Sequence, residues 1–238
     1  MPVRGADKEL QPTDLVMRLP KILVALIFSC VIVFTSGSTQ ASDQGAPGRL
    51  DWHWRKPLQP CNGDCAFMVF AGKSVNSNVQ DIFFKAISPT AWDYGAGGIV
   101  GATFTRRIAT VFHAFDIEAE IGAAKRFGDQ HEGEFWGAMY VRFTAFPWNN
   151  FIYTTLGLST GVNYATGISD FEKAHSGLNP PEGTQIQHYF SPELTFALPD
   201  RRERQLVLRL HHRSGAYGIV SGAASGSTYL SVGLRAWF

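Results

Sequence analysis

Apolar and polar residues alternate at the carboxy-terminal end of the chain. Every second residue from Leu230 to Phe238 is apolar, and the positions between them include Ser231, Gly233 and Arg235. The segment 206–210 has the same pattern, with leucine at each alternate position. A period of two residues predicts β-strands with one apolar face, here two strands joined by a loop rich in Gly, Ser and Ala.

The same period recurs along most of the chain. At 115–121, apolar residues alternate with Asp116, Glu118 and Glu120. A helix would scatter these acids over several faces, so we predict a strand here. The expected strands lie at about 65–75, 94–105, 109–125, 134–146, 151–164 and 186–198 and in the two halves of 206–238, with short turns at 106–107, 147–150 and 199–204.

The connections between these eight strands alternate in character. Those after the second, fourth and sixth strands are tight or charged, whereas those after the fifth and seventh are long. Short periplasmic turns alternating with longer external loops are typical of even-stranded outer-membrane barrels. We therefore predict an all-β fold, an eight-stranded antiparallel outer-membrane β-barrel, embedded in the bacterial cell outer membrane with both termini periplasmic.

One face of the predicted strands carries charges of both signs, which the barrel would direct into its lumen. An eight-stranded barrel is just wide enough for side chains to fill it. Because unpaired buried charge is costly, we expect an ion-pair network there rather than a pore or a pocket for a small hydrophobic ligand. The predicted lumen residues are Asp116, Glu118, Glu120, Arg142, Glu193, Arg209, His211, Arg213 and Arg235.

Composition is consistent with a barrel and excludes little else. Charged residues make up 17% of the 238 residues, below the quarter usual in soluble domains. Aromatic residues make up 13% and glycine is plentiful. The net charge of +1 gives no electrostatic reason to expect nucleic acid as a partner.

The amino-terminal segment has the features of a secretory signal peptide. Arg18 and Lys21 precede an apolar run from Ile22 to Phe34, and small polar residues follow up to Ala41. The run is shorter than the roughly 20 residues that a membrane-spanning helix needs. We predict a signal peptide at 1–41, a periplasmic lead-in at 42–64 and the barrel at 65–238.

Two cysteines remain after the predicted cleavage, Cys61 and Cys65. In an oxidising periplasm they would form a disulfide that closes a tight loop. The alternative, a metal site, is less favoured because no histidine lies nearby at ligand spacing. We expect no metal and no cofactor elsewhere in the chain.

His212 and Ser214 interrupt the apolar face of the seventh strand at its external end. By alternation they point toward lipid at the depth of the outer leaflet. Residues i and i+2 of a strand project side by side, roughly 6–7 Å apart, so the imidazole can act as general base for the hydroxyl. By the same alternation His188 falls on the outer face of the sixth strand and is a candidate neighbour.

The motif His212-Arg213-Ser214 and its place in the chain resemble the outer-membrane lipid A 3-O-deacylase family. Those enzymes are eight-stranded barrels that hydrolyse an acyl ester of lipid A, the lipid portion of lipopolysaccharide. The resemblance implies that Ser214 is the nucleophile, His212 the base, and lipid A of the outer leaflet the substrate. Gly215 stands where the family usually has Asn, which leaves a backbone N–H to serve an oxyanion.

The family completes its triad with a Glu on the last strand, which this chain lacks. No Asp or Glu follows Glu203, and the face-matched positions on the last strand are Gly226 and Thr228. Three alternatives follow: a Ser–His dyad works alone, an acid comes from another loop, or the chain is inactive. The candidate loop acids are Asp170, Glu172 and Glu182. The alternative function is a non-enzymatic barrel with a structural or surface-interaction role.

Overall fold

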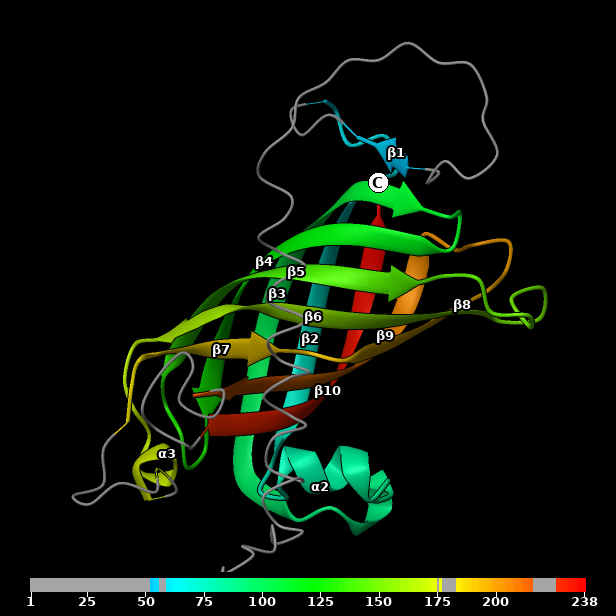
Figure 1. Ribbon diagram of the computed structural model, residues 1–238. Helices are drawn as coiled ribbons and strands as arrows, with labels where there is room; N and C mark the ends of the chain where they lie inside the picture. Colours follow the sequence, from blue (N-terminus) through cyan, green and yellow to red (C-terminus); the bar gives the residue numbers. More distant parts are fainter. Residues whose placement is uncertain (1–51, 56–58, 175, 177–182, 216–225) are drawn as a thin grey trace, which may run out of the picture. The chain divides into compact units, whose positions relative to one another are not determined.

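The fold was analysed in a computed structural model that describes residues 52–55, 59–174, 176, 183–215 and 226–238 (Figure 1). Nearly all of its regular structure is antiparallel strand. The strands are β1 (Trp52–Trp54), β2 (Cys65–Val75), β3 (Tyr94–Val111), β4 (Phe115–Phe127), β5 (Gly133–Phe143), β6 (Tyr153–Ala165), β7 (Ile186–Phe190), β8 (Glu193–Ala197), β9 (Arg204–Ser214) and β10 (Gly226–Trp237).

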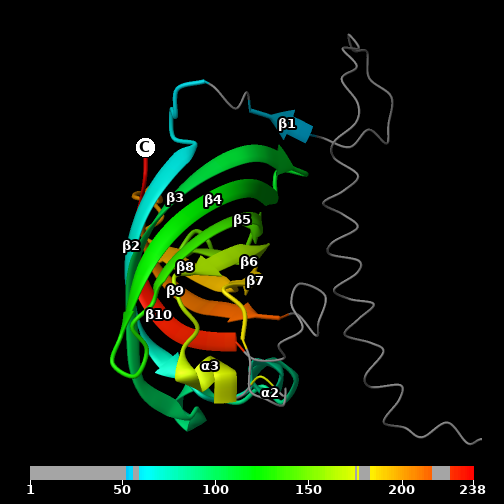
Figure 2. The same ribbon diagram turned by 90° about the vertical axis from the view of Figure 1, so that its left-hand side faces the viewer.

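The strands close into a ring of eight. Each of β2 to β6 pairs with the next, and β10 pairs with both β9 and β2. β7 and β8 occupy one place in the ring, since both lie between β6 and β9. Figures 1 and 2 show these strands wrapping around a common interior. The predicted eight-stranded antiparallel barrel is confirmed.

A two-residue break separates β7 from β8. Pro192 lacks the N–H that a continuous ladder would require. The backbone N–H of Ser191 donates instead to Ser159 Oγ at 2.8 Å, and the Leu210 N–H donates to Pro192 O at 3.0 Å. The Ser191 N–H and the Pro192 carbonyl thus both have partners at the break, and alternation continues unchanged from one half-strand to the other.

The two faces of the barrel differ as the sequence predicts. Along β4, Phe115 and Ile121 are exposed while Asp116, Glu118 and Glu120 are buried. An apolar outside and a polar inside identify a barrel of the outer-membrane type. The exposed apolar side chains of the strands include Phe67, Val69, Val100, Phe104, Phe135, Val141, Leu158, Val162, Ile186, Leu194, Leu206, Leu208, Val232 and Leu234.

The predicted turn at Arg106-Arg107 is wrong. β3 continues through it to Val111, with a register shift between Arg107 and Ala109. The turn instead uses residues 112–114, where Phe112 has a φ of 54°. Within the strand, the Arg107 guanidinium pairs with Asp116 of β4 at 2.9 Å, a contact across the strand pair that alternation alone does not reveal.

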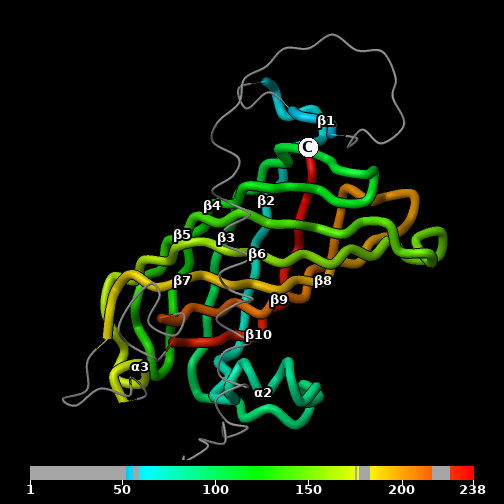
Figure 3. The backbone as a smooth tube through the Cα atoms, viewed as in Figure 1, coloured from blue at the N-terminus to red at the C-terminus, as the bar shows by residue number. Residues whose placement is uncertain are grey.

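Two short helices lie in connections at the barrel end opposite the carboxy-terminus, the end that the expected orientation makes external (Figure 3). α2 (Val79–Phe84) begins at Asn78, whose side chain accepts the Gln80 N–H at 2.8 Å, a regular N-cap. Phe83 of α2 contacts Phe190 of β7, with ring centroids 6.2 Å apart. α3 is Asp170–Ala174, and a 3₁₀ turn spans Pro89–Ala91. Within the described residues, no helix combines the length and apolar character needed to cross a membrane.

Buried ion pairs occupy the middle of the lumen. Glu193 contacts three guanidinium groups, those of Arg142 (2.8 Å), Arg209 (2.7 Å) and Arg235 (2.6 Å). The central cluster, as we call it, has three carboxylates and three guanidinium groups, so its formal charges balance. The predicted ion-pair network is confirmed. The central cluster comprises Glu118, Glu120, Glu193, Arg142, Arg209 and Arg235.

A second network fills the external half of the lumen. Arg126 pairs with Glu134 and with Glu172 of α3, the latter at 3.0 Å. His211 Nε2 lies 2.9 Å from Glu134 Oε2, which confirms His211 as a lumen residue. Arg213 binds Gln187 Oε1 at 2.8 Å and lies 3.6 Å from Glu172. α3 is thereby tied to the barrel interior.

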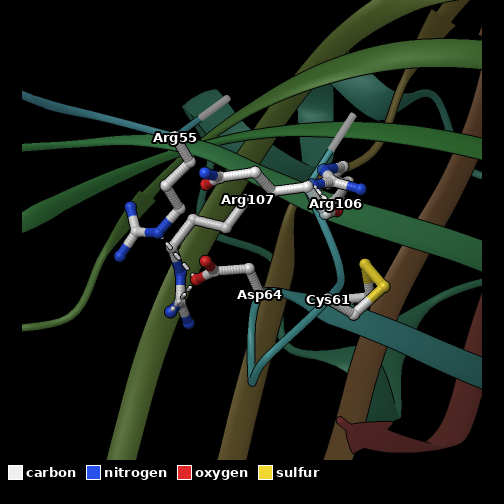
Figure 4. The surroundings of a disulfide bond; sticks show 7 residues. Arg55, Cys61, Asp64, Arg106 and Arg107 are labelled. Carbon is white, nitrogen blue, oxygen red and sulfur yellow. Dashed lines mark hydrogen bonds and ion pairs between the residues drawn. A yellow bond between two sulfur atoms is a disulfide. The ribbon is translucent and has the colours of Figure 1, made fainter. Parts of the chain in front are cut away.

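The Cys61–Cys65 disulfide is present, as predicted, at the amino-terminal end of β2, the end that the expected orientation makes periplasmic (Figure 4). The loop that it closes presents Asp64, which lies 2.7 Å from Arg55 and 3.3 Å from Arg107. β1 pairs with the end of β3, with Trp52 opposite Val111. Figure 3 shows β1 and the carboxy-terminus at the barrel end opposite α2 and α3. The predicted signal peptide lies outside the described residues.

Candidate functional site

The external ends of β7, β9 and β10 bring His212 and Ser214 next to three more polar side chains. In the strand register His212 lies opposite Thr228, and Ser214 lies opposite His188. Opposed residues share a face of the sheet, and this is the outer face. We call this group the His–Ser cluster; its members are Thr160, His188, His212, Ser214 and Thr228. Figure 1 shows the three strands side by side.

His212 is held by a contact across the β9–β10 pair. Its Nδ1 lies 2.8 Å from Thr228 Oγ1, and its side chain is partly exposed. An imidazole whose Nδ1–H donates to a partner keeps the lone pair on Nε2, the nitrogen that can accept a proton. In that tautomer, Nε2 of His212 would be free to accept a proton from a neighbouring hydroxyl.

His188 is a second histidine beside Ser214. Its Nε2 lies 2.9 Å from Thr160 Oγ1 on β6. Directly opposed residues in an antiparallel pair have Cβ atoms about 4.5–5.5 Å apart, closer than the i, i+2 spacing of His212 and Ser214. Ser214 is thus flanked by one histidine along its own strand and another across the strand pair.

Of the two loop acids that the structure describes, neither contacts the His–Ser cluster. Glu172 is fully buried in the lumen, where it accepts from Ser227 Oγ at 2.9 Å and pairs with Arg126. Asp170 is exposed and pairs with Lys173 at 3.1 Å. Glu182 lies outside the described residues. Glu172 as an acid for His212 is therefore wrong, because it is committed to the opposite face of the wall.

The last strand offers one side chain to the His–Ser cluster, that of Thr228. At Gly226, a Cβ would lie 1.7 Å from the backbone oxygen of Arg213, so any side chain would collide with β9. The alternation in the sequence placed Thr228 on the correct face, where it was noted only because it is not an acid. Alternation does not give the strand register, and the register determines that Thr228 lies opposite His212.

Gly215 follows β9 directly and is buried. It lies next to Ser214 in the chain, as a backbone oxyanion donor would require. The connection 216–225 lies outside the described residues. Among the described residues there is no group of three or more His, Cys, Asp or Glu side chains that could hold a metal ion.

Comparisons with known proteins support the fold. No family model matches the chain, and no curated protein sequence matches it. Among solved structures, the outer membrane enzyme PagL matches with a TM-score of 0.51 and 9% identity, over 73% of this chain and 99% of PagL. Neisserial surface protein A matches with a TM-score of 0.45 and 12% identity, over 76% of this chain and all of that one. The ring of strands and the PagL match together show an eight-stranded outer-membrane β-barrel.

Proposed function

We propose that the chain is a serine-type ester hydrolase that removes an acyl chain from lipid A in the outer leaflet. One observation carries this proposal: a polar His–Ser pair, partly exposed, within a small polar cluster on a largely apolar outer face. Structural stability gives no reason for a histidine and a serine in a position that borders lipid. A substrate that is itself a lipid of the outer leaflet would explain why both residues are there.

The chemistry follows the arrangement of the residues. His212 Nε2 takes the proton of Ser214 Oγ as that oxygen attacks the ester carbonyl and forms a tetrahedral intermediate. The Gly215 N–H is the proposed oxyanion donor. Collapse breaks the ester C–O bond, and the sugar hydroxyl leaves with the proton held by His212. Water then hydrolyses the acyl-serine in the same way and releases a fatty acid.

The surroundings of the His–Ser cluster fit an acyl substrate. Phe190 lies opposite His212 in the register, and Phe83 of α2 packs on it. These rings lie on the same outer face as the polar group, so an acyl chain and its ester can be contacted together. This placement supports a lipid substrate over a soluble one.

Ser214→Ala is expected to abolish the activity because it removes the nucleophile. Mass spectrometry of lipid A from cells that express the wild type should show loss of one hydroxyacyl mass, and cells with the variant should retain it. Ser88→Ala, an exposed serine in the connection 76–93, is the matched control and should behave like the wild type. Deacylation by a folded Ser214→Ala barrel would contradict the assigned nucleophile.

The second candidate function is a non-enzymatic barrel that acts through its external surface. The connection between β6 and β7 is long, and α3 within it is anchored to the lumen by Glu172. An anchored external loop is also what a surface-interaction protein would present. Unchanged lipid A in cells whose outer membrane contains the folded wild type would favour this alternative.

We also propose that residues 1–41 are removed as a signal peptide. The intact mass of the protein purified from outer membranes should then correspond to a chain that begins at Ser42. A mass that includes 1–41 would contradict the proposed cleavage. The measurement needs no activity, so it tests targeting independently of the hydrolase.

A further inference from the structure

We infer that Thr228 is the positioning residue for His212 and takes the place of the acid in the usual triad. The inference rests on the proposed function. Its basis is the 2.8 Å contact between His212 Nδ1 and Thr228 Oγ1 across the β9–β10 pair. Thr228 is 6% exposed, so water does not compete strongly for its hydroxyl.

We assign the Nδ1–H of His212 as the donor in this contact, since a threonine hydroxyl can either accept or donate. In that tautomer the Nε2 lone pair is available to Ser214. In a triad the third residue holds the base in the correct tautomer and orientation and stabilises the imidazolium. A hydroxyl performs the first of these tasks, but it carries no charge with which to perform the second.

The position of Thr228 is not interchangeable with its neighbours. Ser227 points into the lumen and binds Glu172, and Gly226 has no room for a side chain. β10 is also paired on both sides, with β9 and β2, so the Thr228 backbone is fixed. Strand register alone thus determines which hydroxyl meets His212.

Thr228→Val tests the inference because it keeps the shape of the side chain and removes the oxygen. Because Thr228 is inferred to act through His212 and not on the substrate, kcat for lipid A deacylation should fall about tenfold, the scale of one neutral hydrogen bond, with KM unchanged. Thr228→Ser restores the hydroxyl and should recover most of kcat. Thr144→Val is the matched control, since it removes a threonine hydrogen bond outside the His–Ser cluster, in the connection after β5. Thr160→Val removes the corresponding contact from His188 and tests the other histidine as the base.

Two kinetic outcomes would overturn the inference. One is a kcat for Thr228→Val equal to that of the wild type. The other is a loss of kcat in Thr160→Val but not in Thr228→Val, which would assign the base to His188.

A spectroscopic measurement separates this inference from the proposed function. Nitrogen-15 NMR of histidine-labelled barrels in lipid nanodiscs reports the tautomer of His212 without turnover, with His212→Gln identifying the signal. We expect Nδ1 to be protonated in the wild type and that preference to be lost in Thr228→Val. An unchanged tautomer would overturn the inference even if the wild type proves active. An inactive wild type with the expected tautomers would refute the hydrolase and leave the His212–Thr228 contact as a structural one.

Discussion

At the scale of single residues, Glu193 joins the three arginines of the central cluster. It is 1% exposed and contacts the guanidinium groups of Arg142, Arg209 and Arg235. Because the formal charges of the central cluster balance, removal of this one carboxylate leaves an excess positive charge away from water. The ion pairs of the central cluster share partners, so removal of one side chain weakens the remaining ion pairs.

Glu193→Gln should therefore destabilise the barrel by about 3–5 kcal/mol, the usual cost of breaking a buried pair from one side. Urea unfolding of the protein refolded into lipid vesicles measures the change. Glu203→Gln, at an exposed glutamate in the connection between β8 and β9, should lie within about 0.5 kcal/mol of the wild type. Equal stability of Glu193→Gln and wild type would show that the central cluster is not energetically coupled.

At the scale of elements, each strand of the barrel has one face that contacts lipid. Val232 lies in the middle of β10, opposite Leu208 and Ala71, and is 52% exposed. Ile186, also exposed, begins β7 at its external end. The cost of a charge on such a face depends on depth, because only the middle of the bilayer lacks water.

Val232→Arg should destabilise the folded barrel by about 2–4 kcal/mol, whereas Ile186→Arg should cost about 0–1 kcal/mol. Equilibrium unfolding in lipid vesicles gives both values from paired titrations. The ratio matters more than either number, since both variants introduce the same side chain. Equal costs would mean that one of the two positions does not lie at the depth assigned to it.

At the scale of the whole molecule, alternation was sufficient to predict the ring and both of its faces. Alternation with a period of two residues shows which side chains lie on the same face of a strand. Closure of the sheet into a barrel directs the polar face inward. Alternation does not state which residues face each other across strands. The turn assigned to Arg106-Arg107 was wrong for that reason, and the same gap hid the contact between His212 and Thr228.

The position of Glu172 could not be predicted from alternation either. Glu172 was a candidate because it lies in the long connection between β6 and β7, but its side chain is buried in the lumen and His212 lies on the outer face. Whether a loop residue turns outward or inward depends on its partners, here Arg126 and Ser227, which come from other strands. No local pattern in the connection between β6 and β7 specifies those partners.

The filled lumen has a consequence for the cell that carries this protein. Arg209 alone reaches from β9 to Glu120 on β4, and its side chain is inaccessible to solvent. Such side chains join opposite sides of the wall and fill the middle of the lumen. We therefore expect the barrel to add an external surface to the envelope without adding a path for small solutes through the outer membrane.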